Sequence, residues 1–134
     1  MNKDIRWKQR FQNFEKSIIL LKELNDYNLN EISNLQREGF IQRFEVCFEQ
    51  AWKTLKDYLE YLGNDVLLSP RPVVKEAFAV GIVQDGQVFI DIIDDRNKMS
   101  HIYDEVEFNR IFSQIVHKYA PALFELCDYF KEQI

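Results

Sequence analysis

The residues best suited to chemistry lie close together in the segment IDIIDDRNKMSHIYDE, residues 90–105. Within it are Arg96, Asn97, His101 and Tyr103. An arginine carries a permanent positive charge, asparagine and tyrosine offer hydrogen bonds, and a histidine exchanges protons near neutral pH. These side-chain types bind charged groups and transfer protons, so the segment is the first candidate for a functional site.

Arg96 occupies an unusual position if this segment is helical. At about 100° per residue, it falls between Ile92 and Ile93, within the apolar stripe. The solvated side is expected to be carried by other residues: Gln87, Asp91, Asp94, Asp95 and Lys98. Burying a guanidinium costs several kcal/mol unless it is paired and hydrogen-bonded. Arg96 therefore points inward and requires a partner.

Two interpretations of this partner remain open. In the structural one, Arg96 pairs with a carboxylate of the second long helix, Glu45 or Glu49, and His101 caps the end of its own helix. In the functional one, Arg96 and His101 share a site, although they lie roughly 140° apart on an ideal helix. Such a site needs either a helix end near Ser100 or a second copy across an interface, which predicts a homodimer.

The pattern R-x-x-x-x-H-x-Y, from Arg96 to Tyr103, resembles the signature of HEPN proteins, including the polar residue directly after the arginine. Three blocks look like the nucleotidyltransferase substrate-binding branch of that superfamily, in order and over most of the chain. They are IQRFEVCFEQAWKTLKDYLEYLG, SPRPVVKEAF and DDRNKMSHIYDE. The spacing alone is a weak signal, whereas the three blocks together identify the chain as a member.

The resemblance implies a helical bundle that dimerises, sets two R-x4-H motifs across a shared cleft and works beside a minimal nucleotidyltransferase encoded nearby. Many relatives are metal-independent ribonucleases that act as toxins, with the nucleotidyltransferase as antitoxin. This branch has also been interpreted as a non-catalytic subunit that presents a nucleotide or other substrate to its partner. The chain is accordingly expected either to cleave RNA or to bind a nucleotide, and both interpretations stay open.

The same resemblance assigns roles within the motif. His101 would be the general acid or base for attack of a ribose 2′-OH, Arg96 would stabilise charge on the phosphate, and Asn97 would orient His101 or the phosphate. In related pairs the nucleotidyltransferase transfers AMP from ATP to the tyrosine of the motif, here Tyr103. The alternative is that Tyr103 is an ordinary aromatic residue whose hydroxyl bonds to a neighbouring carboxylate or to the backbone.

Further charged residues could support or bind at such a site. On the second long helix these are Arg43, Glu45, Glu49 and Lys53. Charged residues spaced four apart on a helix are usually a solvated face, so that interpretation stands beside the functional one. On a shorter helix, Arg71 and Lys75 could contact phosphate or could equally be ordinary exposed residues.

Two long helices are predicted in the first half of the chain. Apolar residues from Trp7 to Leu21 recur at steps of four and three, which indicates a helix ending near Asn25. The same rhythm from Ile41 to Leu62 indicates a second helix that stops at a glycine. Between them, Asn30 is a candidate N-cap, and a glycine at position 39 indicates a bend rather than a break.

Three more helices are predicted in the second half. A short one lies between Ser69, as N-cap with proline in the first turn, and Gly81. The segment 85–99 contains β-branched residues that favour a strand, but its polar spacing favours a helix. A last helix begins at about Glu105 and is kinked near Pro121. Together these segments predict an all-α, antiparallel up-and-down bundle of about five helices.

Composition agrees with one helical domain over residues 1–134. The chain is 46% hydrophobic with four glycines and three prolines, which excludes a disordered or loop-dominated protein. Seventeen basic against 22 acidic residues argue against a broad basic surface for nucleic acid, so any RNA contact must be local.

The remaining expectations concern location and cofactors. The apolar runs are too short to span a bilayer and the start MNKDIRWKQR lacks a signal-peptide core, which predicts a cytoplasmic protein with no membrane partner. Cys47 and Cys127 lie in helical patterns, and two histidines cannot complete a zinc site with them at any recognised spacing. We expect no disulfide, no metal and no cofactor.

Overall fold

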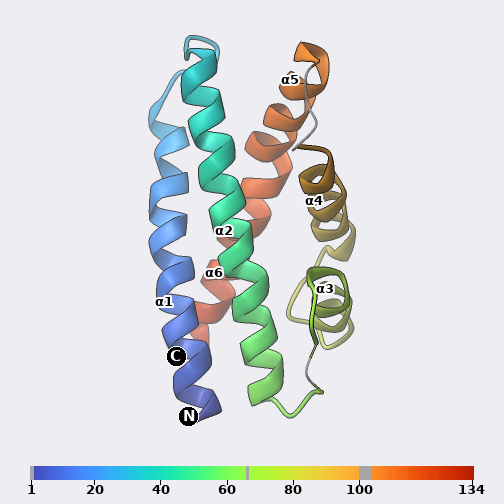
Figure 1. Ribbon diagram of the computed structural model, residues 1–134. Helices are drawn as coiled ribbons and strands as arrows, with labels where there is room; N and C mark the ends of the chain where they lie inside the picture. Colours follow the sequence, from blue (N-terminus) through green and yellow to red (C-terminus); the bar gives the residue numbers. More distant parts are fainter. Residues whose placement is uncertain (1, 66, 100–103) are drawn as a thin grey trace.

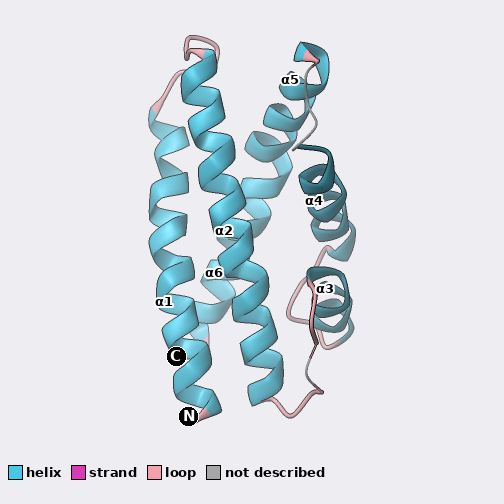
Figure 2. Ribbon diagram, in the orientation of Figure 1, coloured by secondary structure: helices cyan, strands magenta, loops and turns pink. Residues whose placement is uncertain are grey.

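The computed structural model describes residues 2–65, 67–99 and 104–134, and over these ranges the chain is helical with no strand. The predicted all-α bundle is confirmed, with five helices if the interrupted last one is counted once (Figures 1 and 2). The α-helices are α1 (Lys3–Lys22), α2 (Asn34–Tyr61), α3 (Pro70–Ala79), α4 (Gly86–Met99), and the last helix formed by α5 (Glu105–Gln114), a π-helical turn (Ile115–Tyr119) and α6 (Ala120–Glu132). A short 3₁₀ helix (Glu23–Asp26) follows α1. No helix in the described ranges has an apolar stretch long enough to cross a membrane.

Figure 1 shows α1 and α2 side by side and antiparallel, with α3 and α4 along the other side of α2. The last helix passes behind α2, and α6 packs on both α1 and α2. Large aromatic residues fill the space between these elements. Those that are almost fully buried are Trp7, Phe11, Phe14, Phe44, Phe48, Tyr119 and Phe130.

The start of α2 differs from the predicted one. The prediction of Asn30 as the N-cap is wrong, because the helix begins after Ser33. The Ser33 hydroxyl accepts the N–H of Gln36 at 3.1 Å, and the Gln36 side chain accepts the N–H of Ser33 at 2.8 Å. This reciprocal pair satisfies two backbone donors, one more than a lone asparagine cap would satisfy. Gly39 lies inside α2 and does not break it.

The last helix is interrupted near Pro121, as predicted, and the form of the interruption is a π-helical turn. The N–H of Ala120 donates to the carbonyl oxygen of Ile115, five residues earlier. Proline has no N–H to donate, and in a regular helix its ring clashes with the carbonyl four residues before it. The wider turn accommodates Pro121 at the start of α6, and it carries Tyr119 into the core.

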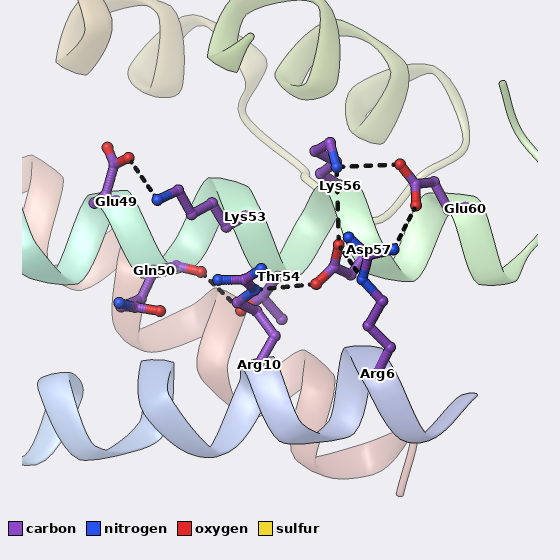
Figure 3. A network of polar contacts seen from close by, with 9 residues as sticks. All are labelled: Arg6, Arg10, Glu49, Gln50, Lys53, Thr54, Lys56, Asp57 and Glu60. Atoms are coloured by element: carbon purple, nitrogen blue, oxygen red, sulfur yellow. Dashed lines mark hydrogen bonds and ion pairs between the residues drawn. The ribbon is translucent and has the colours of Figure 1, made fainter. Parts of the chain in front are cut away.

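A charged cluster ties the start of α1 to the second half of α2 (Figure 3). Asp57 is buried, and its carboxylate lies 3.0 Å from Nε of Arg10 and 3.6 Å from Nε of Arg6. One turn further along α2, Glu60 pairs with Lys56 at 3.2 Å. A buried carboxylate is tolerated only with such partners, so the cluster fixes how α1 and α2 align at this end.

Candidate functional site

Arg96 lies in the last turn of α4 and reaches across to α2. Its Nη2 donates to Oε2 of Glu49 at 3.2 Å, and its guanidinium carbon lies 5.0 Å from the ring centroid of Phe48. About a quarter of the side chain, 26%, remains exposed. The inward orientation and the carboxylate partner of Arg96 are confirmed, and of the two candidate partners Glu49 makes the pair. A guanidinium stacked on a ring and held from one side still presents other N–H groups to a ligand.

Glu49 gathers three donors. Besides Arg96, the indole N–H of Trp52 donates to Oε2 at 3.0 Å and the ammonium of Lys53 lies 3.1 Å from Oε1 (Figure 3 shows Lys53). Partial burial raises the pKa of Glu49, but the bonds from Trp52, Lys53 and Arg96 outweigh this and hold it below its usual value. Glu49 therefore stays ionised at neutral pH and balances the charge of Arg96.

Arg96 borders a cavity of about 450 Å³ between α2, α3 and α4. Its lining is Glu45, Ser69, Pro70, Arg71, Ile93, Arg96 and Asn97. Asn97, the polar residue after the arginine, is exposed here. Arg71, from the first turn of α3, pairs with Oδ1 of Asp94 at 2.7 Å. Two guanidinium groups and an amide on one concave surface can bind an anionic oxygen group such as a phosphate ester.

A buried carboxylate lies beside Arg96 in the sequence and was missed. Asp95 was predicted on the solvated side of α4, which is wrong, because only 5% of it is exposed. The hydroxyl of Tyr119 donates to Oδ2, and Nη2 of Arg110 donates to Oδ1 at 2.8 Å. Burial and the bond to Asp95 raise the pKa of Tyr119 well above its usual value. The phenol therefore stays protonated and available as a donor over the physiological pH range.

The Asp95 network joins the two sides of the motif. Asp95 lies just before the last turn of α4, and Arg110 belongs to α5, so the bond between them links the helices before and after segment 100–103. His101 and Tyr103 fall in that segment, which is outside the described residues.

The supporting residues predicted on α2 divide between two faces. Glu45, Glu49 and Lys53 lie on the side of Arg96. Arg43 lies apart from them, because Nη1 donates to Glu23 at 2.6 Å and to the carbonyl oxygen of Leu20 at 2.9 Å, both beside α1. The structure brings three of the four together near Arg96.

Removal of the Tyr119 hydroxyl tests the Asp95 network. Tyr119→Phe is expected to lower the free energy of unfolding by about 1–3 kcal/mol, because a buried carboxylate oxygen loses its donor. Urea denaturation followed by circular dichroism measures this. Tyr61→Phe is the matched control, since Tyr61 is 43% exposed and its hydroxyl has no hydrogen-bond partner in the part of the chain that the structure describes. Equal stability of the two variants would contradict a structural role for the bond.

Comparison with known proteins identifies the family to which this chain belongs. A family described as "nucleotidyltransferase substrate binding protein like" matches residues 9–132. A relative in Haemophilus influenzae (strain Rd), "Probable ribonuclease HepT", is 23% identical over 111 residues, which cover 78% of this chain and 76% of the relative. A crystal structure of a protein from Thermus thermophilus has a TM-score of 0.76 and 32% identity, covering 84% of this chain and 94% of that one. The chain belongs to the nucleotidyltransferase substrate-binding protein-like family and is a distant homologue of probable ribonuclease HepT, which confirms the membership predicted from its three sequence blocks.

Proposed function

We propose that this chain is a metal-independent endoribonuclease and the toxin of a two-gene system whose second gene encodes a minimal nucleotidyltransferase. The placement of Arg96 carries the proposal. Its guanidinium is held by Glu49 and Phe48 at the border of an open cavity, where a phosphate can reach it. The similarity to a protein named probable ribonuclease supports the same chemistry.

The catalytic residues in this proposal are Arg96, Asn97 and His101. His101 takes the proton of a ribose 2′-OH, whose oxygen attacks the adjacent phosphorus. The bond from phosphorus to the 5′-oxygen breaks, and that oxygen takes a proton from a water molecule, whose hydroxide then receives the proton held by His101. The products are a 2′,3′-cyclic phosphate and a 5′-hydroxyl. Arg96 stabilises the negative charge that builds on the phosphoryl oxygens, and Asn97 orients the phosphate. The substrate supplies its own nucleophile, so the reaction needs no metal-bound water.

We propose that the composite site forms across a homodimer. On a regular helix Arg96 and His101 would point to sides roughly 140° apart. Because α4 is described as far as Met99, a site within one copy is the alternative that the mixing experiment below tests. A two-fold axis would place Arg96 of one copy opposite His101 of the other.

A second function, that of a non-catalytic subunit presenting a nucleotide to the nucleotidyltransferase, is favoured by charge. The chain carries a net charge of −5, and Arg96 is already neutralised by Glu49. Both features weaken binding of a long polyanion more than binding of a single nucleotide. The description of the family points the same way, and a cleavage assay separates the two functions.

Substitution of the motif tests the enzyme. His101→Ala and Arg96→Ala are each expected to lower RNA cleavage by about a hundredfold or more and to relieve growth arrest on expression, because proton transfer and charge stabilisation are lost. Gel analysis of a fluorescent oligoribonucleotide measures cleavage, and circular dichroism checks the fold. His117→Ala is the matched control, since His117 is exposed on the π-helical turn. Cleavage that survives loss of His101, or that EDTA abolishes, would rule out this mechanism.

Mixing the two inactive variants tests the shared site. If each site takes Arg96 from one copy and His101 from the other, a mixed dimer of Arg96→Ala and His101→Ala contains one intact site. Random exchange of subunits makes half of the dimers mixed, so about a quarter of the wild-type activity should return. Sedimentation equilibrium establishes that the chain is dimeric under assay conditions. A purely monomeric chain, or no recovery of activity after verified exchange, would argue for a site within one copy.

We infer that the nucleotidyltransferase silences the toxin by transferring AMP from ATP to Tyr103. The tyrosine oxygen loses its proton to solvent and forms a bond to the α-phosphorus, the bond from the α-phosphorus to the oxygen of the β-phosphate breaks, and pyrophosphate leaves. The new phosphate would compete with RNA for Arg96 without unfolding the protein. After co-expression with the partner, mass spectrometry should find an AMP adduct on the peptide that contains Tyr103. Tyr103→Phe should lose the adduct, and an adduct that persists in this variant would place the modification elsewhere.

A further inference from the structure

We propose that Arg71 is a second phosphate-binding residue, which holds the phosphodiester next to the one bound by Arg96 when a single-stranded RNA crosses the cavity. The proposal rests on the proposed function, because it assigns part of the RNA substrate to a described surface. Arg71 belongs to α3, a helix outside the R-x4-H-x-Y segment.

The cavity offers what a strand of phosphodiesters needs. Arg71 and Arg96 are both in its lining, the first from the start of α3 and the second from the end of α4. The Ser69 side chain makes no capping bond to α3, so its hydroxyl can donate to a ligand. Ile93 supplies an apolar surface for a ribose or base. Phosphate groups suit such paired guanidinium groups because each accepts two parallel N–H bonds.

The lining itself carries more positive than negative groups. It contains two guanidinium groups, Arg71 and Arg96, and one carboxylate, Glu45, while the carboxylates that pair with the arginines, Asp94 and Glu49, lie outside it. The whole chain is acidic, with a net charge of −5, so binding energy for RNA must come from local contacts of this kind. In this proposal a mononucleotide phosphate engages Arg96 alone, whereas adjacent phosphodiesters of a strand engage Arg96 and Arg71 together.

Arg71 is available to a ligand because its present partner is exposed. The side chains of Arg71 and Asp94 are 44% and 52% exposed, and water screens an ion pair of this kind. A phosphate can replace Asp94 at little cost. Asp94 therefore competes with a phosphate for Arg71, which lowers the affinity of the cavity for RNA.

Binding of a non-cleavable RNA tests the subsite separately from catalysis. The probe is a fluorescent single-stranded oligoribonucleotide with 2′-O-methyl groups throughout, titrated with the full chain at several salt concentrations. Arg71→Ala is expected to weaken binding about tenfold and to reduce the slope of log affinity against log salt by about 0.7, the share of one phosphate contact on a single strand. Lys75→Ala removes an equal charge one turn along α3 at a residue that does not line the cavity, and should leave both unchanged.

A second pair of variants removes the effect of leaving Asp94 unpaired. Asp94→Asn should bind the probe more tightly than the wild type, because it frees Arg71 and removes a negative charge. Arg71→Ala added to Asp94→Asn should cancel that gain and again lower the salt slope. If Arg71→Ala in either background behaves like Lys75→Ala, the subsite is refuted.

The outcomes distinguish this proposal from the ribonuclease proposal. If the chain cleaves ordinary RNA but binds the probe equally well with and without Arg71, the ribonuclease proposal stands and the subsite proposal fails. If the chain cleaves no RNA and yet binds the probe through Arg71, the subsite proposal stands and the ribonuclease proposal fails. AMP and ATP are titrated as alternative ligands. Nucleotide binding that depends on Arg71, without RNA binding, would assign the cavity to a free nucleotide and overturn the RNA assignment. A wild-type chain that binds no probe overturns it as well.

Discussion

The buried carboxylate of Asp95 is the contact on which the arrangement of the site depends. Its two oxygens are taken by Tyr119 from the π-helical turn and by Arg110 from α5. A carboxyl group with 5% exposure is stable only where such donors are fixed, so α4 and the last helix have little freedom to slide past each other. Because Asp95 precedes Arg96 directly, the same constraint determines where the Arg96 guanidinium meets α2.

Glu49 plays a different part, because it faces Arg96 from a partly exposed position. The pair keeps the arginine extended and oriented before any ligand arrives, which reduces the conformational entropy lost on binding. The pair also sets a minimum binding free energy for any ligand, since a weakly bound monovalent anion gains too little free energy to replace the carboxylate of Glu49. A ligand that engages several groups of the cavity at once exceeds this threshold, which makes the pair a source of selectivity.

Sequence patterns predicted most of the fold, because each helix is defined by local signals. Apolar spacing indicated the helices, and Pro121 marked the interruption of the last one. The inward direction of Arg96 also followed from local spacing. The burial of Asp95 did not, since its partner Tyr119 lies 24 residues away and no pattern in the sequence connects them. The choice of Ser33 over Asn30 was accessible, because Gln36 three residues later completes a capping box. The site was thus predictable where one helix determines it, and not where two helices meet.

The π-helical turn has a consequence for how this helix tolerates insertions and deletions. A π turn is equivalent to one residue inserted into an α-helix, and it rotates everything beyond it by about 100°. Before the turn, the last helix directs Arg110 toward α4, and after it the helix directs Leu123 and Phe130 into the core beside α1 and α2. Deleting one residue from Ile115–Tyr119 would give a more regular helix but would turn one of these faces away from its partner. The extra residue allows one helix to contact α4 with one face and to pack against α1 and α2 with another.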